Sequence, residues 1–177
     1  SPEPPCSAAA IRGIPLNWDL ARGLVGTADM RMVMMWLETT LAGLLLGIQA
    51  TVGPQRFALC LRAAGQQGTA LLPPRPRGVE DIHQTFQRYS DFYVACGWGR
   101  CELDEFDLEG RRARIRVLNS WEGRLQRSLG TCWGSCILAG RLSALCSELF
   151  GCPCWAEQTA FLARGDAMDS ETKLQYV

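Results

Sequence analysis

The stretch Thr131–Gly151, TCWGSCILAGRLSALCSELFG, decides the fold, because it has the composition of a helix that is buried on most sides. Its charged residues, Arg141 and Glu148, lie seven positions apart and therefore share one narrow stripe of a helix. A helix with so little polar surface packs inside a domain. Small side chains also recur along it at helical spacing, which lets another backbone approach closely or leaves room for a ligand: Cys132, Cys136, Gly140, Ser143, Ala144 and Ser147.

The composition of the chain indicates a globular protein that does not itself bind nucleic acid. The 177 residues include 18 Lys and Arg against 18 Asp and Glu, so the basic excess that phosphate backbones require is missing. Nine cysteines are many, and several lie among leucine and alanine in the core helix, where thiols behave as small apolar groups. The chain opens with SPEPPC rather than with a secretory signal. We therefore expect mostly free thiols and a cytoplasmic location.

A membrane span is considered for Met32–Ala50, which contains a single charged residue, Glu38. The segment begins with a Met/Val run, has Glu-Thr-Thr near its centre and lacks a basic flank. A buried strand at Arg31–Trp36 followed by a helix at Glu38–Val52 explains these features better. The prediction is a protein without a membrane partner.

The order of the predicted elements gives the domain organisation. Residues 1–13 are rich in proline and alanine and are expected to form a flexible lead-in, whereas residues 14–177 are expected to form a single domain. Beyond the strand and helix already named, the pattern predicts two further helices, Gln55–Ala64 and Val79–Cys96, and two strands, Cys154–Ala163 and Thr172–Val177.

A β-hairpin is predicted from Arg100–Asp107 and Arg112–Trp121. In the second arm every other residue from position 112 to 116 is arginine, and apolar residues lie between them. Continuing this alternation places Trp121 on the apolar face. Glu102 and Asp104 of the first arm are expected to pair with the arginines. Hairpins interleaved with helices indicate an α+β fold, an antiparallel sheet with helices packed on one face.

Catalytic chemistry is not indicated. The single histidine, His83, has no nucleophile motif around it and is interpreted as a structural residue or a polar contact in a ligand pocket. Zinc is an alternative for some of the cysteines, although their spacing departs from that of strong zinc motifs. The candidate metal ligands are Cys132, Cys152, Cys154 and Glu157, with Cys136 on the same helical face as Cys132.

The second half of the chain resembles the 4-vinyl reductase (4VR) domain family. The resemblance covers Arg31 to Val177, and its most specific pieces are Asn119-Ser120-Trp121-Glu122, Cys132-Trp133 with Gly140, and Gly165-Asp166. The family implies an α+β ligand-binding fold. Its members include sensor domains of aromatic-responsive bacterial activators, an accessory protein of bacteriochlorophyll vinyl reduction and the small subunits of the TRAPP tethering complex.

The resemblance also implies which residues have a function. The tryptophan of the Ser-Trp-Glu stretch, here Trp121, faces the pocket in the aromatic sensors. Those sensors hold zinc through Cys, Glu and two further Cys. Cys132 and Glu157 match this set, but the other two positions are occupied by Ala160 or Phe161 and by Asp169.

The leading hypothesis is a cytoplasmic, non-catalytic sensor domain of a bacterial regulatory protein, which binds a small hydrophobic or aromatic ligand and forms a homodimer. One alternative is a tetrapyrrole-binding accessory protein, and another is a protein-assembly module of the TRAPP type. The expected ligand-binding residues are Trp121, Phe92, Tyr93, Phe106, Trp133 and His83.

Overall fold

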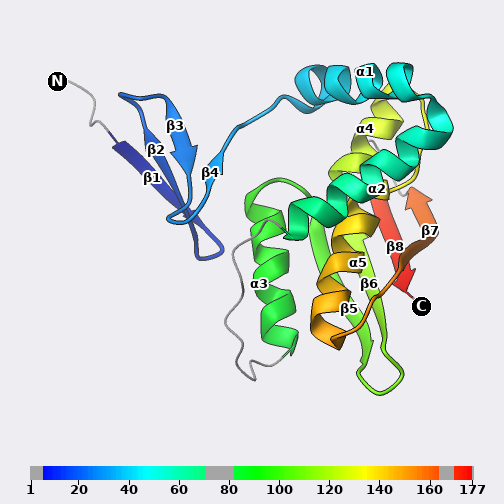
Figure 1. Cartoon of the computed structure of the whole chain (residues 1–177). Helices are drawn as coiled ribbons and strands as arrows, with labels where there is room; N and C mark the ends of the chain where they lie inside the picture. Colours follow the sequence, from blue (N-terminus) through cyan, green and yellow to red (C-terminus); the bar gives the residue numbers. More distant parts are fainter. Residues whose placement is uncertain (1–5, 71–81, 164–169, 177) are drawn as a thin grey trace.

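A computed structural model describes residues 6–70, 82–163 and 170–176. The chain folds into two four-stranded antiparallel sheets with helices beside the second one (Figure 1), which confirms the α+β prediction. Within these ranges, none of the helices combines the length and apolar character that crossing a bilayer demands.

The first sheet is a meander of β1 (Cys6–Ile11), β2 (Ile14–Asp19), β3 (Leu24–Gly26) and β4 (Arg31–Met32). It stands to one side of the helices in Figure 1. Residues 6–13 therefore belong to a hairpin, where a flexible lead-in was expected, and the predicted domain start at residue 14 lies inside that hairpin. The alanine-rich β1 has little strand propensity of its own, so its pairing with β2 determines its conformation.

The buried strand predicted at Arg31–Trp36 is largely wrong. β4 ends at Met32, and the next four residues, Val33 to Trp36, are irregular and more than half exposed. They connect the first sheet to the helical turn η1 (Leu37–Leu41) and α1 (Ala42–Val52). An apolar run therefore marks a surface segment here, because nothing in the described chain packs over it.

The core helix is α5 (Cys136–Phe150), which begins five residues later than predicted and leaves Cys132 outside. It crosses α2 (Pro54–Ala70), which was expected to end at residue 64. A Cβ atom at Gly65 would collide with the backbone of Ile137, and one at Gly140 would collide with the backbone of Arg62. The two helices thus touch through their backbones, and this contact explains why α2 continues through glycine.

The second sheet has the order β5-β6-β8-β7, with β5 (Arg100–Asp107), β6 (Arg112–Leu118), β7 (Ala156–Ala163) and β8 (Ser170–Tyr176). α3 (Ile82–Ala95) and α5 cover one of its faces (Figure 1) and form a core with it that includes Ile115, Val117 and Leu142. On the other face, Arg116 forms ion pairs with Glu102 at 3.7 Å and Asp104 at 2.5 Å. The predicted cross-strand pairing is therefore confirmed.

The predicted second arm of the hairpin is three residues too long. β6 ends at Leu118, and Asn119 has a φ of 54°, a left-handed conformation that interrupts the alternation of faces. Trp121 is therefore not a strand residue but the first residue of α4 (Trp121–Leu129). It is buried, as expected, but in a second core between α4, α1 and α2, where it lies with Phe57 and Leu125.

Candidate ligand-binding site

A row of four aromatic rings joins the two cores. Tyr89 and Tyr93 come from successive turns of α3, Trp98 follows in the turn before β5, and Trp121 begins α4. The ring centroids are 4.6 Å apart for Tyr89 and Tyr93, 5.4 Å for Tyr93 and Trp98, and 6.2 Å for Trp98 and Trp121. The two tryptophans are also connected through the backbone, because the Trp121 N–H donates to the Trp98 carbonyl at 3.1 Å.

Arg141 brings a positive charge to this row from α5. Its residue surface is 8% exposed, and its guanidinium carbon lies 4.3 Å from the Trp98 ring centroid and 5.7 Å from that of Tyr93. Cation–π contacts with the two rings compensate part of the cost of burying the charge. Its Nε–H, however, is buried without an acceptor among the described residues. An unsatisfied buried donor of this kind favours a bound acceptor.

The other polar groups near the row remain neutral at physiological pH. Burial raises the pKa of both Tyr89 and Tyr93, and the Tyr89 hydroxyl donates to the Tyr93 hydroxyl at 2.8 Å. Burial likewise raises the pKa of the Cys101 thiol to about 12. The site therefore offers phenol hydroxyls and aromatic faces around one buried cation.

Glu122, the neighbour of Trp121, ties α4 to the start of α5. It is fully buried, and its carboxylate accepts hydrogen bonds from the N–H groups of Ile137 at 3.0 Å and Leu138 at 2.8 Å. The free N–H groups at a helix start favour a negative charge. Burial acts in the opposite direction and dominates, raising the pKa of Glu122 to about 7.

The structure brings together only some of the expected ligand-binding residues. Tyr93 and Trp121 lie in the row, and Trp133 packs in the same core as Trp121, with its ring 5.5 Å from that of Phe57. Phe92 packs against the sheet-side core, and His83 lies exposed on α3.

Phe106 packs against the same core as Tyr89 and Tyr93 but lies away from the tryptophan end of the row. It stacks on Phe150 with centroids 4.9 Å apart, near the other end of β5 from Trp98. Phe106 lies six positions along β5 from Arg100, which is near Trp98. Six positions correspond to roughly 20 Å along a strand. The sequence pattern could not place Phe106 and Trp121 relative to each other, because they belong to different elements.

Tyr89, Trp98 and Arg141 were not expected to belong to the site. Trp98 stands between Gly97 and Gly99, next to the start of β5. Arg141 gave a usable signal, because an arginine on a helix this apolar must find a partner inside the protein. The partner itself lies on another element and has no local signature.

The candidate zinc ligands are spread over separate segments. Cys132 and Glu157 are exposed, and Cys152 and Cys154 are half-buried in the connection from α5 to β7. Among the described residues no three His, Cys, Asp or Glu side chains come together as metal ligands would. Zinc binding by Cys132, Cys152, Cys154 and Glu157 stays a prediction.

Comparisons with known proteins give a likeness of fold. No protein-family model matches the chain, and no curated protein matches it. Among solved structures, it is similar to the phenol-responsive sensory domain of the transcription activator PoxR, which was crystallised with phenol. The TM-score is 0.65, the sequences are 16% identical, and the match covers 91% of this chain and 84% of the other. The chain therefore shares the fold of that sensory domain.

Proposed function

We propose that this chain is a ligand-binding sensor domain for small aromatic molecules, with Tyr93, Trp98, Trp121 and Arg141 forming its ligand contacts. The observation that carries the proposal is the ring row with a buried guanidinium above it. Aromatic ligands pack well on the edges and faces of such rings. Binding sites of this kind combine apolar walls with a few directed polar groups.

Arg141 indicates which aromatic molecules suit the site. Its Nε–H has no acceptor within the described part of the chain, so a ligand with an oxygen atom would satisfy it. Phenols carry such an oxygen on an aromatic ring. The fold match supports this ligand class, because the matching domain is described as phenol-responsive.

Binding rather than catalysis is the proposed activity. The polar groups beside the rings are two tyrosine hydroxyls and a thiol whose pKa values are all raised by burial. Groups held in their neutral form are weak nucleophiles and bases at neutral pH, but they are suitable hydrogen-bond donors. The thiols also suit a reducing compartment, so we place the sensor in the cytoplasm of a bacterium.

We further propose that the sensor forms a homodimer through the segment from Val33 to Trp36. Its four side chains are between 51% and 80% exposed and carry no charge. Leu44 of α1 and Leu59 of α2 are also more than half exposed. Exposed apolar stretches on soluble proteins mark interfaces, and an uncharged stretch is best covered by an equally apolar one, such as the same segment of a second copy.

The sensor proposal is tested by titrating the protein with phenol, with toluene as its analogue without an oxygen, and following binding by calorimetry and thermal shift. Wild-type protein is expected to bind phenol more tightly than toluene, because toluene leaves Arg141 unsatisfied. Trp121→Phe keeps a ring in the core but changes its shape, and should weaken phenol binding about tenfold or more.

Trp155→Ala is the matched control, because Trp155 is exposed and lies outside the ring row. It should leave phenol affinity unchanged. If wild-type protein binds neither compound nor related phenols, or if Trp155→Ala and Trp121→Phe weaken binding equally, the ring row is not the ligand site.

A further inference from the structure

A pocket lies beside the first sheet, and its lining includes none of the four rings of the row. Its volume is about 390 Å³, within the range of small-molecule sites. Three arginines from three different elements line it: Arg12 from the turn between β1 and β2, Arg100 from the start of β5 and Arg124 from α4. Val94 and Leu118 add apolar wall.

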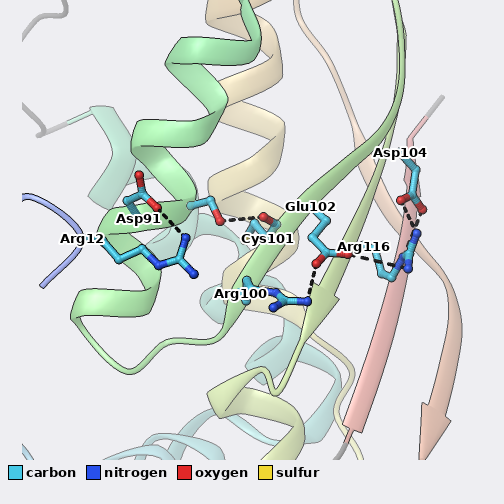
Figure 2. A network of polar contacts seen from close by, with 8 residues as sticks. Arg12, Asp91, Arg100, Cys101, Glu102, Asp104 and Arg116 are labelled. Carbon is cyan, nitrogen blue, oxygen red and sulfur yellow. Dashed lines mark hydrogen bonds and ion pairs between the residues drawn. The ribbon is translucent and has the colours of Figure 1, made fainter.

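The positive charge of this pocket is only partly compensated. None of the described residues that line it carries a carboxylate. Arg12 lies 3.5 Å from Asp91 and Arg100 lies 2.5 Å from Glu102 (Figure 2). Neither acid is among the residues that line the pocket. In an exposed setting such pairs contribute little and exchange readily for another anion.

Arg124 has no carboxylate partner among the described residues. Its Nη2 donates to the Gly97 carbonyl at 2.9 Å, and its Nε is buried without an acceptor. Guanidinium groups bind carboxylates and phosphates through charge-assisted hydrogen bonds, and the charge of Arg124 is not compensated by a carboxylate of the described chain. Arg124 is therefore the side chain best prepared to receive an anion.

We propose that this pocket binds a small organic anion with two or more negative charges, a polycarboxylate or a phosphate ester. Three guanidinium groups match more than one negative charge, and the apolar wall of Val94 and Leu118 matches a carbon skeleton. The anion would bridge the first sheet, through Arg12, to α4 and β5.

Several residues that line the pocket are sequence neighbours of the ring row. Gly97 and Gly99 line the pocket and flank Trp98, while Leu118 and Asn119 line it and lead into Trp121. Drawing Arg124 toward an anion changes its bond to the Gly97 carbonyl, next to Trp98. Anion and aromatic ligand should thus alter each other's affinity by one and the same factor. This coupling rests on the proposed sensor function, whereas anion binding itself does not.

The test titrates the full chain with citrate and with inorganic phosphate, using acetate at matched ionic strength as the monovalent reference, and follows binding by calorimetry. Wild-type protein should bind citrate or phosphate at least tenfold more tightly than acetate. Tighter binding of citrate would indicate that the ligand is a polycarboxylate. Tighter binding of phosphate would indicate that the ligand is a phosphate ester. Equal, weak binding of all three would overturn the proposal.

Variants locate the binding. Arg124→Gln and Arg12→Gln should each lower citrate or phosphate affinity at least tenfold. Arg12 is half exposed, so its variant remains informative if Arg124→Gln fails to fold. The control is Arg22→Gln, because Arg22 lies in the turn between β2 and β3 of the first sheet and pairs with Asp19 at 2.6 Å, but does not line the pocket. An equal loss in Arg22→Gln would show diffuse charge attraction and refute the site.

The coupling has its own measurement, the phenol titration repeated with saturating citrate or phosphate. A changed phenol affinity in wild-type protein that disappears in Arg124→Gln supports the link between the two sites. If phenol does not bind at all, the sensor proposal fails and the anion site stands on the calorimetry alone. If phenol binds and the anion leaves its affinity unchanged, the coupling is wrong.

Discussion

Replacing Glu122 with glutamine should remove most of the pH dependence of stability between about pH 5 and pH 8. This carboxyl is fully buried between α4 and α5 and has no cationic partner among the described residues. Its pKa is about 7 in the folded state, against an ordinary value of 4.5. The folded protein therefore binds more protons than the unfolded chain between these two pH values.

The sign and size of the effect follow from this difference. A raised pKa in the folded state stabilises the protein fully below the ordinary pKa, and this contribution is lost as the pH rises through 7. The difference corresponds to roughly 3 kcal/mol in the free energy of unfolding, most of it lost between pH 5 and pH 8. Above about pH 8 the cysteines of the unfolded chain begin to ionise and obscure the effect.

The assay is urea unfolding followed by tryptophan fluorescence at a series of pH values. Wild-type stability should fall toward pH 8, whereas Glu122→Gln should stay nearly level, because glutamine resembles the protonated acid. The control variant is Glu157→Gln, which alters an exposed side chain on β7 and should keep the wild-type slope. A wild-type stability that rises from pH 5 to pH 8 would refute the reasoning, since the Ile137 and Leu138 N–H groups would then outweigh burial.

Two further predictions concern packing and surface charge. Gly140→Ala should lower the free energy of unfolding by about 1–3 kcal/mol, because the added methyl group meets the backbone of Arg62. Gly43→Ala should instead raise the free energy of unfolding by about 0.5–1 kcal/mol, because a methyl group at Gly43 meets nothing within 4 Å. Equal effects of the two glycine variants in urea unfolding would contradict the close helix contact. Arg116→Gln should change the unfolding free energy by less than about 1 kcal/mol despite the ion pairs with Glu102 and Asp104, because solvent screens such surface pairs. A larger loss of unfolding free energy in urea would contradict this screening.

The predictable part of the fold is the part with a local pattern. The alternation of charged and apolar residues predicted the β5–β6 hairpin and its ion pairs, and the apolar composition of residues 131–151 predicted α5. The pattern mispredicted the end of β6, because the left-handed conformation of Asn119 interrupts the strand. It also mispredicted the end of α2, because the contact of α2 with Gly140 of α5 lets that helix continue through glycine. Neither effect leaves a trace in hydrophobic periodicity.

The candidate site, like the fold, was predicted in part. Tyr93 and Trp121 were expected as ligand contacts and lie in one row, but Trp98, which joins them, was not among the expected contacts. Arg141 stood out as a charge on an apolar helix, yet its position over Trp98 depends on how α5 crosses the turn before β5. These contacts join elements that are far apart in the chain. They depend on how the elements pack together, which a local sequence pattern does not reveal.

The backbone contact between α2 and α5 limits how this molecule can move. Helices slide past each other when the side chains between them exchange one packing for another. At Gly65 and Gly140 there are no such side chains, so sliding would bring backbone atoms into collision. The two helices must therefore move as one rigid body, so a change of shape in this protein cannot come from sliding between them.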